Sequence, residues 1–438
     1  MKQPNVSVGI ISNDELKFAF NGSYTAEGSA FTGEQTARID DGKVLFGGKH
    51  YDELTFQPDS PDASFTLHQV IIGVSFHWRR AEDQTFSGSL KLIVEGDKLT
   101  AVNILPVEDY LLSVISSEMS AKASLELLKA HAVISRSWLL AQIHKTDEEK
   151  NFAQDSGEMT DTDDLLIKWW DRDDHVNFDV CADDHCQRYQ GITKASTPAV
   201  RDAINATRGI VLTYDGKLCD ARFSKSCGGV MEEFENCWEP HHHPYLQARR
   251  DSADENNFPD LTREDNAAEW ILSKPDAFCN TTDANILSQV LNDYDQETKD
   301  FYRWEVNYTQ DELAKLIHQR TGTDYGRIRD LQPVARGTSG RLYQLRIVGE
   351  KRTRVIGKEL TIRYALSPTC LYSSAFVVQR HDIDADGYPA KFTLCGAGWG
   401  HGVGLCQIGA AVMGAKGYNF KEILLHYFPG ASITPLYS

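Results

Sequence analysis

The residues best suited to chemistry lie between Pro106 and His144, where one carboxyl group and two cations occur close together. Glu118 follows an apolar helical pattern, and Lys129 and Arg136 are seven residues apart, which places them on one face of a second helix. A carboxyl group partly withdrawn from water holds its proton more readily and can act as a general acid. A surface ion pair is the plainer interpretation of the same residues, and the spacing does not decide between the two.

Two helices that meet at a short break would position these groups. The first is predicted over residues 107–117 from its apolar stripe, and it ends beside Glu118. Ser124 has the residue type and the position of an N-cap for a second helix that begins at Leu125. We therefore expect Glu118 at a helix end, where its side chain can point into a cleft.

A second stretch contains two imidazoles and two thiols within twelve residues, namely His175, Cys181, His185 and Cys186. They form the ligand complement that a tetrahedral zinc ion takes in a closed structural site. Their order is not that of a zinc finger, so paired or free cysteines beside solvated histidines stay as alternatives. Because four protein ligands leave no open position, the zinc is predicted to be structural. The run of histidines over residues 241–243 is interpreted as an exposed loop.

Two glycine-rich segments could bring polar groups close to a ligand. One is a turn that contains Ser226, although a tight hairpin would need the same small residues. The other is a loop after a predicted strand, and it carries His401 and Gln407. This loop matches neither the dinucleotide-binding fingerprint nor the Walker A motif, which argues against a nucleotide site.

The composition restricts the partners of this chain. A formal net charge of −18 over 438 residues argues against nucleic acids and anionic membranes, both of which need a basic surface. No apolar stretch is long enough to span a membrane, and residues 1–9 lack the apolar segment of a signal peptide. Nine cysteines cannot all pair with one another within the chain.

The predicted elements give an α+β fold with four parts. A β-rich region over residues 1–105 precedes a mixed α/β core, which is expected in two parts, 106–250 and 341–438. An acidic, partly helical insertion over 251–340 separates them. Further helices are predicted at 161–172, 286–294 and 310–321, and a capping box of Asn419 and Glu422 predicts one near the C-terminus.

Together, these segments resemble the SpoIID/LytB family of peptidoglycan proteins. The resemblance rests on VEDYLLSVISSEM, LELLKAHAVISRSW, SKSCGG and GWGHGVGLCQIGAAVMGAKG, which extend from about residue 100 to the C-terminus. It implies a lytic transglycosylase that acts on the glycan strands of peptidoglycan, in SpoIID-like members on strands already stripped of stem peptides.

The same resemblance assigns roles to individual residues. The catalytic glutamate of the family falls on Glu118, and the substrate-binding positions fall on the following residues of this chain: Lys129, Arg136, Ser226, His401 and Gln407. Clostridial members are similar in carrying a His/Cys metal site after the helices, which supports structural zinc in this chain. The sequence departs from the family at Ser120, where proline is common, and at Cys227 and Cys406, where serine is common.

The mechanism can be argued from the chemistry of the bond. Cleavage needs a proton on the leaving oxygen and a nucleophile at the anomeric carbon. The sequence signals no second carboxylate beside Glu118, since Glu126 is expected off the face of Lys129 and Arg136. A single-acid scheme is therefore predicted, in which Glu118 protonates the leaving oxygen and then accepts a proton from the C6 hydroxyl to give a 1,6-anhydro product.

Two other functions stay open at this point. One is a non-catalytic enhancer that binds glycan and stimulates an N-acetylmuramoyl-L-alanine amidase of the cell wall. The other is a cysteine hydrolase that uses Cys227 or Cys406 with His401. The resemblance implies a location in the cell envelope, whereas the absence of a recognisable signal peptide leaves a cytoplasmic location open.

Overall fold

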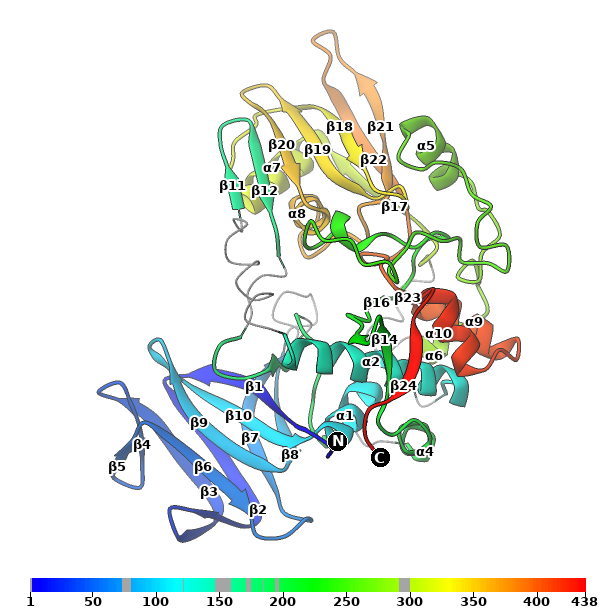
Figure 1. Ribbon diagram of the computed structural model, residues 1–438. Helices are drawn as coiled ribbons and strands as arrows, with labels where there is room; N and C mark the ends of the chain where they lie inside the picture. The colour runs from blue at the N-terminus through cyan, green and yellow to red at the C-terminus, as the bar shows by residue number, and fades with distance from the viewer. Residues whose placement is uncertain are drawn as a thin grey trace. The chain divides into compact units, whose positions relative to one another are not determined.

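The computed structural model of the protein describes residues 2–72, 80–120, 122–145, 159–170, 175–183, 185–193, 197–290 and 300–438. It divides into two compact units, each described here by itself (Figure 1). Unit 1 comprises Met1–His144, His175–Asp220 and Ile433–Ser438, and unit 2 comprises Lys145–Asp174 and Ala221–Ser432. The α+β class is confirmed. The finer division at residues 105, 250 and 340 stays a prediction.

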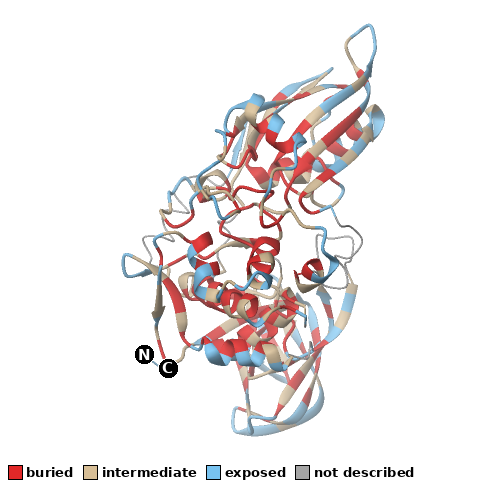
Figure 2. Ribbon diagram, turned by 90° about the vertical axis from the view of Figure 1, so that its right-hand side faces the viewer, coloured by how far each residue is buried: buried red, intermediate tan, exposed pale blue. Residues whose placement is uncertain are grey.

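The N-terminal part of unit 1 is rich in β-structure, as predicted. Its strands are β1 (Asn5–Asn13), β2 (Glu15–Ala26), β3 (Ser29–Asp40), β4 (Lys43–Phe46), β5 (Lys49–Tyr51), β6 (Glu53–Pro58), β7 (Ser64–Ile72), β8 (Arg80–Ser87), β9 (Ser89–Glu95) and β10 (Lys98–Pro106). Along β2, Leu16, Phe18 and Phe20 are buried and alternate with more exposed residues, which is the period of a strand with one covered face (Figure 2). Phe56 packs edge-on against Phe18 in this core, with ring centroids 5.9 Å apart.

The rest of unit 1 is built around two helices, α1 (Val107–Glu118) and α2 (Leu125–Ile143). The Ser124 hydroxyl accepts a hydrogen bond from the backbone N–H of Leu127, so the predicted N-cap is confirmed. Helix α2 packs against α4 (Pro198–Ala206) and β14 (Ile210–Tyr214). The remaining strands near these helices are β13 (Val180–Cys181), β15 (Lys217–Leu218) and β24 (Ser432–Pro435).

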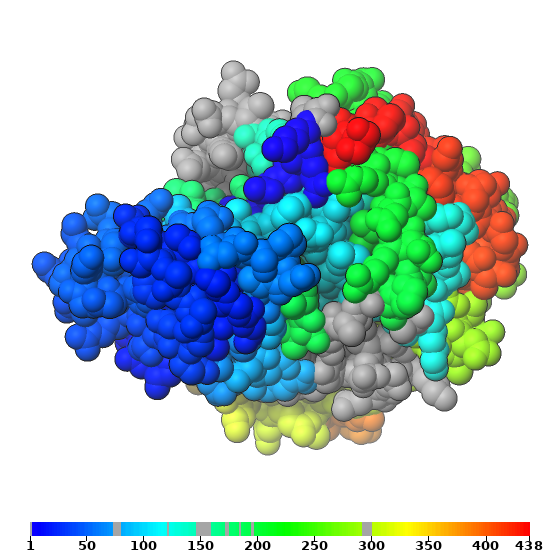
Figure 3. Space-filling view, turned by 90° about the horizontal axis from the view of Figure 1, so that it is seen from below, coloured from blue at the N-terminus to red at the C-terminus, as the bar shows by residue number. Residues whose placement is uncertain are grey.

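The two ends of the chain meet beside the start of α1. The backbone N–H of Val107 donates to the carbonyl of Pro4, and the N–H of Leu436 donates to the carbonyl of Gly209. Figure 1 and Figure 2 place the two termini side by side, and Figure 3 shows the dark blue first residues next to the red last ones. Residues from both ends therefore hold the segment that leads to Glu118.

Unit 2 contains further sheets and the remaining helices. One sheet has the order β11-β12-β20-β19-β18, another has the order β17-β22-β21, and β16 pairs with β23. The strands are β11 (Met159–Asp161), β12 (Leu165–Lys168), β16 (Phe223–Ser224), β17 (Arg303–Thr309), β18 (Ile328–Arg336), β19 (Leu342–Gly349), β20 (Thr353–Gly357), β21 (Phe376–Ile383), β22 (Pro389–Ala397) and β23 (Leu405–Cys406). The helices are η1 (Phe234–Asn236), α5 (Glu264–Leu272), α6 (Ala284–Val290), α7 (Gln310–Thr321), α8 (Glu359–Ala365), α9 (Gln407–Ala415) and α10 (Phe420–Tyr427).

One predicted helix is wrong and the others agree where the structure describes them. The segment predicted as a helix at 161–172 is described up to residue 170 and contains the strand β12 instead. This strand pairs in parallel with β20, with Leu165 opposite Val355. Helix α7 matches the prediction, and α6 covers the start of the segment predicted at 286–294, whose last four residues lie outside the described ranges. The capping box of Asn419 and Glu422 before α10 is confirmed.

Within the described ranges, none of the helices has both the length and the apolar character required to cross a membrane.

Candidate functional site

Glu118 is the last residue of α1 and is half-buried. The helix ends there because the N–H of Met119 makes the final helical hydrogen bond, 2.9 Å to the carbonyl of Ile115, and Met119 itself is extended. Met119 is buried at 2% exposure and anchors the chain directly after the carboxyl group. The structure therefore places Glu118 where the sequence predicted it, at the junction between two helices.

Arg136 was predicted to bind substrate, and the structure places its guanidinium in the interior of unit 1, with 0% exposure. Its Nε and Nη2 atoms donate to the two carboxylate oxygens of Glu108, at 3.0 and 2.7 Å, and Nη1 donates to the carbonyl of Ile210 at 3.0 Å. Burial alone would raise the pKa of Glu108, but the hydrogen bonds and charge of Arg136 lower it below the ordinary carboxyl value. Arg136 thus connects α2 to Glu108 of α1, and its contact with substrate stays a prediction.

Glu108 also binds two further segments of unit 1. Its Oε1 atom accepts hydrogen bonds from the N–H of Gly209 at 3.1 Å and from the Tyr437 hydroxyl at 2.7 Å. Gly209 has φ +66°, and a side chain at this position would overlap the Tyr437 carbonyl. The start of α1 is thereby fixed to α2 and to the C-terminal residues. Sequence reasoning missed Glu108, which has no signal beyond being an acidic residue in a first helical turn.

Lys129 lies on the same helix as Arg136 but has a different partner. Its Nζ atom is 2.7 Å from a carboxylate oxygen of Glu126, and the two side chains are 19% and 30% exposed. Glu126 therefore lies beside Lys129, contrary to the expectation that it would be off this face. The three-residue spacing on a helix explains the contact.

The four predicted zinc ligands lie together in unit 1. His175, Cys181, His185 and Cys186 each offer a ligand atom within 4.8 Å of the others. Cys186 Sγ lies 3.4 Å from His175 Nε2 and 3.4 Å from His185 Nδ1. Zinc bonds of about 2.0 Å to nitrogen and 2.3 Å to sulfur require about 3.5 Å between such atoms in a tetrahedron. The donor set and its spacing therefore fit the ion.

The surroundings of this cluster favour thiolate ligands and hold them in place. Hydrogen bonds with Cys186, His175 and His185 lower the pKa of Cys181 to about 2, which favours its thiolate form. The N–H of Cys181 donates to Cys186 Sγ at 3.4 Å. Strand β13 pairs in parallel with β1, with Cys181 opposite Gly9. The cluster is thus attached to the sheet next to the helices.

Unit 2 brings the two glycine-rich segments together. The backbones of Ser226 and Trp399 exchange hydrogen bonds of 3.0 and 2.8 Å, and β16 pairs with β23 through Ser224 and Cys406. A side chain at Gly398, where φ is +76°, would come 2.8 Å from the Ser226 carbonyl. The small residues therefore allow the backbones of the turn and the loop to approach each other closely.

Ser226 and Gln407, which were predicted to bind substrate, are both interior residues in unit 2. Ser226 is 0% exposed, and its hydroxyl has no hydrogen-bond partner among the described residues. Gln407 is 2% exposed and begins α9. Contact of either side chain with a glycan stays a prediction, and it would require these residues to become accessible.

His401 is half-buried and neutral. Its Nδ1 atom accepts a hydrogen bond from the N–H of Val403 at 3.0 Å, which leaves the proton of a neutral ring on Nε2. Burial and the nearby cations, first among them Arg222, lower the pKa of His401 well below 6.5. The ring also contacts Trp238, with centroids 4.6 Å apart. His401 can therefore offer a hydrogen bond or a ring surface, but not a positive charge.

Arg341 joins the turn to the loop, and no motif in the sequence reveals it. Its side chain is 2% exposed; Nη1 donates to the Cys227 carbonyl at 3.0 Å and Nε donates to the Gly400 carbonyl at 3.1 Å. Ser339 Oγ accepts from Arg341 at 3.0 Å and donates to the buried carboxylate of Glu232 at 2.6 Å. This chain of contacts fixes the shape of the segment that carries His401.

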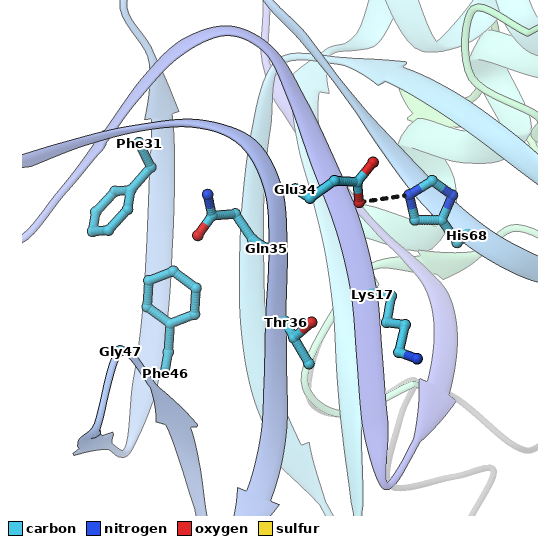
Figure 4. A pocket seen from close by; sticks show the side chains of 8 residues that line it. All are labelled: Lys17, Phe31, Glu34, Gln35, Thr36, Phe46, Gly47 and His68. Carbon is cyan, nitrogen blue, oxygen red and sulfur yellow. Dashed lines mark hydrogen bonds and ion pairs between the residues drawn. The ribbon is translucent and has the colours of Figure 1, made fainter.

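The histidine run and one surface pocket complete the list of candidate features. His241 and His242 are exposed, as predicted, and His242 pairs with Glu235 at 2.7 Å. His243 is half-buried and packs against Phe234, with ring centroids 4.5 Å apart. The pocket, of about 370 Å³, is in the β-rich region and is lined by Phe31, Phe46, His68 and neighbouring residues (Figure 4). None of the predicted site residues lines it, so it does not belong to the candidate site.

Two family models match the chain. Residues 95–214 match the family described as Stage II sporulation protein, and residues 232–404 match a Domain of unknown function (DUF8618). The first match contains α1, α2 and the His/Cys cluster of unit 1. The second contains Arg341 and His401 of unit 2.

Curated proteins show the same similarity. The chain is 27% identical to the amidase enhancer of Bacillus subtilis over 331 residues, which cover 73% of this chain and 40% of that protein. It is 23% identical to stage II sporulation protein D of Bacillus amyloliquefaciens over 341 residues, which cover 76% of each chain. An uncharacterized protein of Brachyspira hyodysenteriae is 25% identical over 80% of this chain and 72% of its own length.

Proposed function

The chain belongs to the SpoIID/LytB family, and from this premise we propose that it is a peptidoglycan lytic transglycosylase of the cell envelope. The proposed substrate is the MurNAc–GlcNAc bond of glycan strands from which the stem peptides have been removed. The observation that carries the proposal is the position of Glu118, a half-buried carboxyl group at the end of a helix whose start is fixed by Glu108 and Arg136.

The proposed reaction uses this single carboxyl group twice. Glu118 donates its proton to the leaving glycosidic oxygen, and the bond from that oxygen to the anomeric carbon breaks. The resulting carboxylate accepts the proton of the C6 hydroxyl, whose oxygen bonds to the anomeric carbon. The products are a 1,6-anhydro end and a new hydroxyl end, so no water is consumed. Lys129, beside the helix junction, is proposed to orient the sugar.

His401 is proposed to contribute through a hydrogen bond or through its ring surface, because its neutral state excludes an ionic contact.

Zinc in the His/Cys cluster of unit 1 fits the proposal as a structural ion. His175, Cys181, His185 and Cys186 would hold it as a closed set of four ligands. The ion would supply rigidity to the segment after α2, and the proposed reaction makes no chemical use of it.

The first experiment separates catalysis from binding. Denuded and intact glycan are incubated with the wild-type protein, and the released ends are identified by mass spectrometry. We expect 1,6-anhydro ends from denuded glycan, and Glu118→Gln should lower their rate of formation by about 10²–10⁴-fold. Asp109→Asn, an exposed position on the same helix, is the matched control and should retain activity.

A second function has one observation in its favour, the similarity to an amidase enhancer. In that role the chain would bind glycan and stimulate a cell-wall amidase without releasing anhydro ends. The same incubations with an added N-acetylmuramoyl-L-alanine amidase test this. The wild type and Glu118→Gln would then stimulate the amidase equally, and neither would release anhydro product. This result would contradict the transglycosylase proposal and support the enhancer role.

A further inference from the structure

A second cluster of metal-binding groups lies in the interior of unit 2. It consists of Cys227, Asp251, Cys279 and Cys406, whose ligand atoms all lie within 4.8 Å of one another. The four residues are between 0% and 2% exposed. They come from four separate segments: the turn after β16, the segment before α5, the segment before α6, and the N-cap of α9. The proposed glycan chemistry uses none of them.

The sulfur positions fit a single ion better than a disulfide. Cys227 Sγ and Cys279 Sγ are 3.6 Å apart, far beyond the roughly 2.05 Å of a disulfide bond. Two sulfur ligands at about 2.3 Å from a tetrahedral metal ion are about 3.8 Å apart. A polynuclear cluster would place its cysteines further from one another, because several metal atoms would lie between them.

Backbone N–H groups around Cys406 stabilise the thiolate form of its side chain. Its sulfur accepts hydrogen bonds from the N–H of Cys227 at 3.3 Å and from the N–H of Gly409 at 3.5 Å. Gly409 lies in the first turn of α9, where the helix dipole favours a negative group. A side chain at Gly409 would overlap the hydroxyl of Tyr427, so the close approach depends on glycine here.

Asp251 is held at the same point by groups that leave it able to bind a cation. One carboxylate oxygen accepts from the N–H of Cys279 at 2.9 Å, and the other accepts from the Tyr427 hydroxyl at 2.8 Å. His426 Nε2 lies 3.6 Å from this second oxygen, and its other ring nitrogen lies 2.8 Å from Glu255. Partners of this kind commonly orient the ligands of a metal site.

We propose that Cys227, Cys279 and Cys406, with Asp251 as the fourth ligand, bind one structural zinc ion in unit 2. Three thiolates select a soft or borderline cation, and the tetrahedral spacing favours zinc. The closed and buried ligand set leaves no position for a substrate. The ion would also order the proposed glycan-binding segments, because Ser226 precedes one ligand in the sequence and Gln407 follows another.

Metal content of the purified full-length protein tests this directly. After dialysis against a buffer with trace zinc, elemental mass spectrometry should find two zinc ions per wild-type chain. The double variant Cys181→Ser/Cys186→Ser should retain one, and Cys279→Ser should also retain one. Cys395→Ser, a half-buried cysteine of unit 2 outside the cluster, is the matched control and should keep two. One ion in the wild type, and one in Cys279→Ser, would overturn the proposal.

Two further measurements test the second zinc site without the variant Cys279→Ser, so they do not depend on its folding. Cobalt bound to the double variant Cys181→Ser/Cys186→Ser should show thiolate-to-metal charge-transfer absorption, and its absence would contradict a second site. Wild-type protein that is denatured with a chelator and without reductant should expose nine alkylatable thiols, the number of cysteines in the chain. Seven thiols, with Cys227 and Cys279 linked, would show a disulfide in place of the metal site.

Discussion

The Arg136 guanidinium makes two hydrogen bonds to the Glu108 carboxylate, and both side chains are almost completely withdrawn from water, at 0% and 5% exposure. This pair connects α1 to α2, and the same carboxylate also receives the Tyr437 hydroxyl from the end of the chain. The direction in which Glu118 leaves α1 therefore depends on a charge pair ten residues earlier. Four predictions follow from this pair and from the contacts described above.

Arg136→Met should destabilise unit 1 strongly, because it leaves the Glu108 carboxylate buried without its partner. Breaking a buried pair in this way typically costs about 3–5 kcal/mol of unfolding free energy. Urea denaturation followed by circular dichroism measures the change. The double variant Glu108→Met/Arg136→Met removes both charges and should recover much of the loss. A loss below about 1 kcal/mol in Arg136→Met would contradict the burial of this pair.

The same pair predicts a pH dependence at acid pH. The pKa of Glu108 is lowered in the folded state, so its stabilisation is complete above the ordinary carboxyl value of about 4.3 and is lost as the pH falls towards the lowered value. Stability should therefore fall with decreasing pH in this window, as measured by denaturation midpoints. Glu108→Gln has no carboxyl group to protonate, so its slope should be shallower. Equal slopes in the two proteins would show that another group causes the loss.

Gly9→Ala should lower zinc binding at the cluster in unit 1. A Cβ atom at Gly9 would lie 2.5 Å from the ring of Phe178, which packs on the imidazole of His175 with centroids 4.6 Å apart. Displacing this ring moves a predicted ligand, so we expect weaker zinc retention in competition with a chromophoric chelator. Adding Phe178→Ala to the variant removes the clash and should restore part of the affinity. If Gly9→Ala retained zinc as well as the wild type, this would contradict the assignment of His175 as a zinc ligand.

Arg341→Lys should disturb the loop that carries His401 without touching unit 1. The shorter and less branched donor cannot reach both the Cys227 and the Gly400 carbonyls, and each hydrogen bond lost from a charged group costs about 1.5–3 kcal/mol. We expect a lower thermal midpoint and weaker binding to glycan in a pull-down assay. Arg346→Lys, an exposed position on β19, the strand that follows Arg341, should behave as wild type. Wild-type binding by Arg341→Lys would argue against a role of this loop in glycan recognition.

Several features were predictable because they depend on residues close together in the chain. The N-cap at Ser124 and the capping box of Asn419 and Glu422 are contacts between a side chain and backbone groups three residues away. The end of α1 at Glu118 follows from the apolar period and the break after it. His175 and Cys186 are near enough in sequence for their ligand spacing to be visible as a motif.

Only the tertiary structure decided the features that depend on distant partners. The segment at 165–168 is a strand because β20, almost two hundred residues later, offers it backbone hydrogen bonds. The Arg136 guanidinium is buried because Glu108 pairs with it inside the unit, and local spacing carries no information about burial. The four groups from Cys227 to Cys406 became a candidate zinc site only when folding brought their segments together. Hydrogen bonds between residues close in sequence can be predicted from the types of those residues. Burial and ligand geometry depend on the packing of the whole chain.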